Sequence, residues 1–133
     1  MARSMIGLDT NVIVRYLLAD DPQQFTKASK LIKELTPENK GSINLLVIAE
    51  VVWVLHSIYK YHDTRIADSL LAFCASNILE VQHGAEIQEA LADYDGKISI
   101  IDTLIPVINK SKGCSLTKTF DKQASKLPDM QLL

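Results

Sequence analysis

The sequence predicts an α/β fold built on a parallel sheet, because short apolar runs alternate along the chain with longer segments of helical periodicity. No internal repeat or low-complexity stretch interrupts this alternation. The chain has 133 residues, 47% of them hydrophobic, which is enough for one domain with its own core. We therefore expect a single domain over residues 1–133, in which residues 1–4 are an alternative start or an appended tail.

Each expected element has a local signal. The expected strands are the apolar runs 5–8, 41–44, 78–81, 115–117 and 130–133, the last as a closing edge strand. The expected helices cover 12–17, 22–35, 46–59, 63–74, 87–94, 99–113 and 122–127. Asp21-Pro22 is typical of a helix start, with a cap residue followed by proline. Pro106 should kink the helix that begins at Ser99.

The composition limits the class of protein without naming a function. Charged residues make up 23% of the chain and the net charge is −2, which neither indicates nor excludes a nucleic-acid partner. Cys74 and Cys114 are far apart and form no metal-binding motif, so we expect two free thiols in a reducing compartment. No apolar run is long enough to span a bilayer, and the N-terminus lacks a signal peptide. These observations predict a cytoplasmic protein.

Four acidic residues are the candidate functional residues: Asp9, Glu50, Asp102 and Asp121. Three of them fall close to a strand end or a helix start, where ligand crevices form in α/β folds. Carboxylates gathered at such a rim repel one another unless a cation is present. The pattern predicts a divalent-metal site, and such sites suit the hydrolysis of phosphodiesters.

Each acid also has a local structural explanation. Asp9 and Asp121 could simply cap the helices that follow them. Glu50 lies at the edge of an apolar helical stripe, where it is either a solvated flank charge or a carboxylate that needs a partner. The stretch Ser99 to Asp102 matches a capping box. These alternatives stay open for each residue. A purely structural role for all four acids is nevertheless less expected than such a role for any one of them.

Several basic residues could bind a nucleic-acid backbone. The stretch 110–126 holds five lysines and only one acid, Asp121, so it is either an electrostatic track for a nucleic acid or an ordinary solvated face. Arg15 could face a phosphate, although a surface role is more common for arginine. The three histidines show no metal-ligand spacing.

Four segments of the chain resemble the PIN domain, and more narrowly the VapC-type toxins of bacterial type II toxin–antitoxin systems. They are Met5-Ile6-Gly7-Leu8-Asp9-Thr10-Asn11-Val12, Ile48-Ala49-Glu50-Val51-Val52-Trp53-Val54-Leu55, Asp102-Thr103-Leu104-Ile105 and Thr119-Phe120-Asp121-Lys122. The first and last are the more specific. The resemblance extends in order and spacing over nearly the whole chain from Met5.

The resemblance implies a three-layer α/β/α sandwich with a central parallel sheet. It also implies a ribonuclease that depends on Mg²⁺ or Mn²⁺ and cleaves an RNA such as tRNA or ribosomal RNA with a metal-activated water, leaving a 5′-phosphate. By position, Asp9, Glu50, Asp102 and Asp121 would be the catalytic and metal-binding acids, with Asn11 and Thr119 as supporting polar residues. The implied partners are a cognate antitoxin and a second copy of the chain in a homodimer, with no membrane.

Two departures from the family pattern raise an alternative. Many relatives carry a further Asp where this chain has Ser99, and Pro106 replaces a small helix-forming residue. Ser99 leaves room for a catalytically silent relative that binds only antitoxin or RNA. A phosphoacceptor signalling domain is disfavoured, because the third expected strand ends in Val81-Gln82-His83 without the required Asp.

Overall fold

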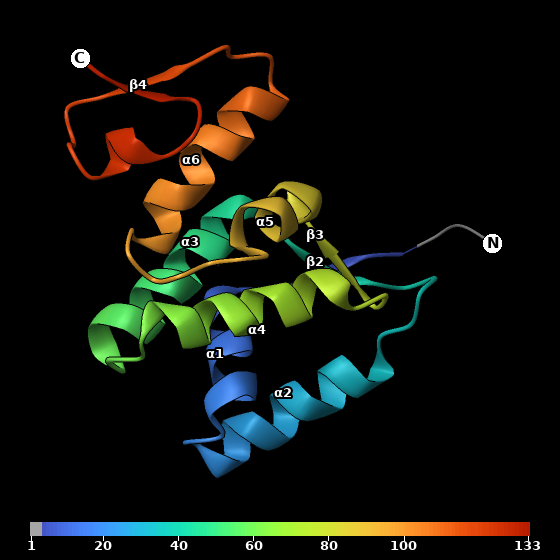
Figure 1. Cartoon of the computed structure of the whole chain (residues 1–133). Coiled ribbons are helices and arrows are strands. Elements are labelled where there is room, and N and C mark those ends of the chain that lie inside the picture. The colour runs from blue at the N-terminus through green and yellow to red at the C-terminus, as the bar shows by residue number, and fades with distance from the viewer. Residues whose placement is uncertain (1–3) are drawn as a thin grey trace.

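The computed structural model describes residues 4–133 and confirms an α/β fold with parallel strands (Figure 1). The expected alternative start concerns residues 1–4, of which 1–3 lie outside the described residues. The α-helices of the described part are α1 (Thr10–Leu18), α2 (Pro22–Glu34), α3 (Leu45–Trp53), α4 (Asp63–Ala75), α5 (Gly84–Leu91) and α6 (Ile100–Ser111). The strands are β1 (Ile6–Gly7), β2 (Gly41–Ile43), β3 (Leu79–Val81), β4 (Thr117–Thr119) and β5 (Met130–Leu132).

The main sheet consists of three parallel strands in the order β1-β2-β3. Parallel neighbours need crossover connections, and α1 with α2 and then α3 with α4 supply them. Gly41 lies in the central strand where space is short. A Cβ at this position would lie 2.9 Å from Leu35 Cδ1 and 2.9 Å from Leu8 Cδ1, so glycine lets both leucines pack against the strand.

Apolar side chains from the main sheet and the surrounding helices form one core. Its most buried isoleucines, each at most 1% exposed, come from β2, α3, α4, α5 and α6: Ile43, Ile48, Ile66, Ile87 and Ile100. The buried members of this core end at Leu104. None of the helices in the described residues is long and apolar enough to cross a membrane.

The last two strands are separate from the main sheet. β4 and β5 pair with each other in parallel, and Figure 1 shows α6 leading away from β2 and β3 to the end of the molecule where β4 lies. We call residues 115–133 the C-terminal unit. The expected edge strand at 130–133 is present as β5, but it pairs with β4 and does not join the main sheet. Side chains of α6 hold this unit. Asn109 Nδ2 donates to Thr117 Oγ1 (3.0 Å), and Lys110 Nζ lies 3.2 Å from Asp129 Oδ2.

Several element boundaries differ from the expectation. The helix expected over 46–59 is α-helical only to Trp53 and continues as a π-helical turn, Val54–Ile58, in which Tyr59 N–H donates to the Val54 carbonyl (3.2 Å). The fourth strand covers Thr117–Thr119 rather than 115–117. The last short helix is a 3₁₀ turn, Ala124–Lys126. α6 continues from Ile100 to Ser111 with the buried Pro106 inside it.

Candidate functional site

Asp9 lies between the end of β1 and the start of α1. Its Oδ1 accepts a hydrogen bond from Thr10 N–H (2.7 Å), so the expected capping role is realised. Its Oδ2 makes no hydrogen bond with any of the residues 4–133. The side chain is exposed, and one carboxylate oxygen therefore remains available to a ligand.

Glu50 lies on α3, and its position follows from the start of that helix. Asn44 caps α3 by accepting from Val47 N–H (3.0 Å). Glu50 is exposed, which corrects the idea that its carboxylate would be costly to desolvate on the apolar stripe. Within the described part of the chain it has neither a hydrogen-bond nor an ion-pair partner. Its charge is solvated and free to bind a cation.

Asp9 and Glu50 line the same cleft, which has a volume of about 400 Å³. Asn11 and Arg15 of α1 line it as well, and Ile58 and Tyr59 contribute from the end of the π-helical turn. The cleft thus places two carboxylates, an amide and a guanidinium together at the carboxyl end of β1. Open α/β sheets bind ligands at this end of their strands.

Arg15 is fixed in the wall of the cleft by three partners. Its Nη1 donates to Asp20 Oδ1 (3.0 Å) and to the Tyr59 hydroxyl (3.1 Å), and its Nε donates to Gln24 Oε1 (2.8 Å). The hydrogen bond with Tyr59 is the main cause that raises the pKa of Arg15, and the charge of Asp20 adds to it. Arg15 therefore stays a cation, and its guanidinium is held in place.

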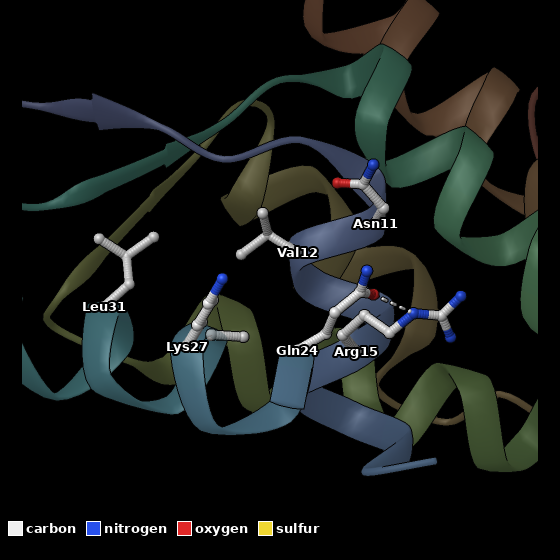
Figure 2. Close-up of a pocket in the computed structure, with 7 residues that line it drawn as sticks. Asn11, Val12, Arg15, Gln24, Lys27 and Leu31 are labelled. Atoms are coloured by element: carbon white, nitrogen blue, oxygen red, sulfur yellow. Dashed lines mark hydrogen bonds between the residues drawn. The ribbon is translucent and has the colours of Figure 1, made fainter. Parts of the chain in front are cut away.

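A second cavity of about 260 Å³ adjoins this cleft and shares Asn11 and Arg15 with it. Figure 2 shows Asn11, Val12 and Arg15 on α1 together with Gln24, Lys27 and Leu31 on α2. The cations that line this cavity are the Lys27 ammonium and the Arg15 guanidinium, the second of which is paired with Asp20. A chain of phosphates running from one cavity to the other would meet cations next to the two acids.

Asp102 lies elsewhere, in the first turn of α6. Its N–H donates to Ser99 Oγ (3.2 Å), which is one half of the expected capping box. Its side chain makes no hydrogen bond with residues 4–133 and does not line the cleft of Asp9 and Glu50. The cap at Ser99 is confirmed.

Asp121 follows β4 and is also outside the cleft. Its Oδ1 accepts from Gln123 N–H (2.8 Å) and Ala124 N–H (3.0 Å), so it caps the 3₁₀ turn, and its own N–H donates to Thr119 Oγ1 (3.0 Å). The structure thus brings together two of the four predicted acids. No group of three or more His, Cys, Asp or Glu residues suited to a metal ion occurs within residues 4–133.

The expected lysine track is only partly free. Lys110 pairs with Asp129 at 3.2 Å, and Lys118 donates to the Gln131 side chain. Of the two cationic residues of the second cavity, the sequence indicates Arg15 but not Lys27. Lys27 is unremarkable on an amphipathic helix, and only the packing of α1 on α2 places it near Arg15. Asp21 caps α2 as expected, and the neighbouring Asp20 pairs with Arg15.

The donor set in the cleft suits a hard divalent cation. Mg²⁺ in proteins usually takes one or two carboxylates directly and keeps several waters. The free Oδ2 of Asp9 and the unpaired carboxylate of Glu50 provide two such oxygens in an open cleft. The residues present therefore fit Mg²⁺ or Mn²⁺.

The fold and this cleft define a class: an α/β protein with a carboxylate site at the carboxyl end of a parallel sheet. The family model described as the PIN domain matches residues 6–130. The chain belongs to the PIN domain family, whose members are typically metal-dependent nucleases. A search of curated proteins found no match to the chain.

Proposed function

We propose that this protein is a metal-dependent endoribonuclease that acts as the toxin of a toxin–antitoxin pair. The observation that carries the nuclease part is the cleft in which Asp9 and Glu50 lie beside Arg15. The toxin part is supported by the four sequence segments that resemble VapC-type toxins. The proposed setting is the cytoplasm, with a cognate antitoxin and a homodimer as partners, and one domain carries the activity.

The chain's own residues would share the work as follows. Asp9 and Glu50 would hold Mg²⁺ or Mn²⁺, which would stabilise negative charge on the phosphoryl oxygens and make water a better nucleophile. Arg15, held by Asp20 and Tyr59, binds a non-bridging phosphate oxygen of the RNA. Asn11 lines both cavities and donates its amide to the same backbone.

The second cavity extends this site along the RNA. Lys27 would bind the phosphate next to the one that is cleaved, because the two cavities share Arg15 and Asn11. RNA is bound most readily where it is single-stranded and its backbone can bend into such a cleft. A loop in tRNA or ribosomal RNA is therefore the kind of substrate that we propose.

A catalytically silent relative that binds antitoxin or RNA is the second candidate. The observation in its favour is that Asp102 and Asp121 lie outside the cleft of Asp9 and Glu50. A protein of this kind would bind RNA through Arg15 and Lys27 without cleaving it.

Cleavage of total tRNA and ribosomal RNA separates the two candidates. Wild-type protein should cleave in Mg²⁺ and stop on addition of EDTA. Asp9→Asn, which keeps the cap at the start of α1, and Glu50→Gln should each lower the rate at least about 100-fold, because each removes a charged ligand. Glu38→Gln is the matched control, since Glu38 is an exposed acid that does not line the cleft.

Two further readouts make the test independent of the choice of RNA. Titration with Mn²⁺ should show a site that Asp9→Asn and Glu50→Gln weaken and Glu38→Gln leaves intact. Expression in a bacterium should arrest growth, and Asp9→Asn should relieve the arrest. Cleavage that persists in EDTA, or in the Asp9→Asn variant, would contradict the mechanism. A folded protein that binds but never cleaves RNA would support the silent relative.

A further inference from the structure

The helix that carries Glu50 changes its hydrogen-bond pattern beside the cleft. It is α-helical to Trp53 and π-helical over Val54–Ile58, where Tyr59 N–H donates to the Val54 carbonyl (3.2 Å). An α-helix turns about 100° per residue, so in an unbroken α-helix Tyr59 would point to the side opposite Glu50. Each residue of a π-helix turns less, because its hydrogen bonds span five residues instead of four. The π-helical turn therefore brings Tyr59 back toward the side of Glu50, and both residues line the cleft.

The hydroxyl of Tyr59 joins an arginine and an aspartate of the first helical segment. It accepts from Arg15 Nη1 (3.1 Å) and donates to Asp20 Oδ2 (3.0 Å). Arg15 Nη1 also donates to Asp20 Oδ1 (3.0 Å), so the three side chains form a closed triangle of hydrogen bonds. Ala19, with a φ of 53°, has the left-handed conformation that ends α1 and turns the chain there. The triangle links the end of α1 to the helix that carries Glu50.

Tyr59 gives the ion pair a fixed geometry. The side chains of Arg15 and Asp20 are 30% and 40% exposed. An ion pair between groups this exposed contributes little on its own, because water competes for both partners. A phenol that accepts from the cation and donates to the anion restricts the pair to one arrangement. Desolvation acts to raise the pKa of the Asp20 carboxyl, but the hydrogen bond from Tyr59 and the charge of Arg15 outweigh it, so this pKa lies below its usual value.

The network uses two of the three nitrogens of the Arg15 guanidinium. Nε donates to Gln24 Oε1 (2.8 Å), as Figure 2 shows, and Nη1 donates to Asp20 and Tyr59. Nη2 has no acceptor among residues 4–133. A guanidinium held in this way presents its remaining N–H groups in a fixed direction, and phosphate oxygens match its planar geometry. One nitrogen of Arg15 is therefore free for a ligand in the cleft.

We propose that Tyr59 is a positioning residue of the cleft, whose hydroxyl fixes Arg15 so that Nη2 binds a phosphate oxygen of the RNA backbone. Tyr59 acts through Arg15 and makes no contact of its own with the phosphate. Because Tyr59 and Glu50 lie on one continuous helix, the same element sets the phosphate contact and the proposed metal ligand. The phosphate contact rests on the proposed function, whereas the hold of Tyr59 on Arg15 does not.

Nitrogen-15 NMR of the arginine side chains tests this hold without RNA or metal. The spectrum of Arg15→Gln identifies the Arg15 signals, and in the wild type the two Nη resonances should be separate, because fixed acceptors hinder rotation of the guanidinium. Tyr59→Phe should speed this rotation about tenfold, which corresponds to the loss of one hydrogen bond to a charged group. Tyr61→Phe is the matched control, since Tyr61 lies outside the cleft and its hydroxyl makes no hydrogen bond with residues 4–133. Equal rotation in the wild type and in Tyr59→Phe would overturn the proposal.

Binding of single-stranded RNA tests the phosphate contact. On the Glu50→Gln background, which prevents cleavage, Tyr59→Phe should weaken binding about fivefold and Arg15→Gln about tenfold. The two changes combined should weaken binding no more than Arg15→Gln alone, because Tyr59 acts only through Arg15. Tyr61→Phe should leave the affinity within about twofold of the background. A combined loss of about fiftyfold, the product of the single losses, would mean that Tyr59 acts independently of Arg15 and would refute its positioning role.

The two experiments separate this inference from the proposed nuclease. RNA binding that depends on Tyr59 as expected, in a wild-type protein that never cleaves RNA, would support the positioning role and refute the nuclease. A wild-type protein that binds no RNA would refute both the phosphate contact and the proposed function, even where Tyr59→Phe frees the guanidinium.

Discussion

The part of the chain before residue 112 and the C-terminal unit use their apolar side chains in opposite ways. In the first, isoleucines from five elements are at most 1% exposed and meet in one core. In the second, Phe120 and Leu133 are 79% and 70% exposed, although the unit has strands of its own. The first part is stabilised by its buried apolar side chains, whereas the second part keeps large apolar side chains exposed. We expect changes in the first part to cost more stability than changes in the C-terminal unit.

The largest expected effect is loss of core packing in the first part. Ile48→Ala should lower the free energy of unfolding by about 3 kcal/mol, because Ile48 is fully buried and its truncation leaves a cavity. Leu46→Ala, two residues earlier on α3 but 81% exposed, should change it by less than about 0.5 kcal/mol. Urea denaturation followed by circular dichroism measures both. Similar losses for the two variants would mean that α3 does not pack as described.

Most of the first part could be predicted from the sequence, because its signals are local. Asp21-Pro22 starts α2 with the cap that the pair predicts, and the short strands alternate with helices as a parallel sheet requires. The separation of β4 from β1 could not be predicted, because strand pairing is a long-range choice. It depends on contacts such as Asn109 with Thr117, which no periodicity reveals.

The candidate site, too, could be predicted from the sequence only in part. Asp9 and Glu50 could be named from the residues and the family resemblance, and the structure places both in one cleft. The resemblance also names Asp102 and Asp121, whose positions depend on where α6 and the C-terminal unit pack. Lys27 and Tyr59 had no signal in the sequence, since they approach Arg15 only through the packing of helices.

Removal of residues 115–133 should have a smaller effect on folding than Ile48→Ala. The buried core ends at Leu104, so the shortened chain should lose about 1 kcal/mol of unfolding free energy and still unfold cooperatively. The measurement is a urea titration followed by circular dichroism. A chain that no longer unfolds in one cooperative transition would show that the C-terminal unit belongs to the core, and the contrast between the two parts would fail.

The smallest expected effect is on RNA binding, and it tests whether the second cavity holds the RNA backbone. Lys27→Gln should weaken the binding of single-stranded RNA about fivefold at moderate salt. It should also reduce the slope of log affinity against log salt by about 0.7, because one phosphate contact is lost. Lys30→Gln is the control, since Lys30 is an exposed lysine on the same helix that does not line the cavity. Binding is measured by fluorescence anisotropy on the Glu50→Gln background, so that the RNA is not cleaved. If both lysines changed the slope equally, the positive charge of α2 would act only as a diffuse field, and the second cavity would have no part in holding the backbone.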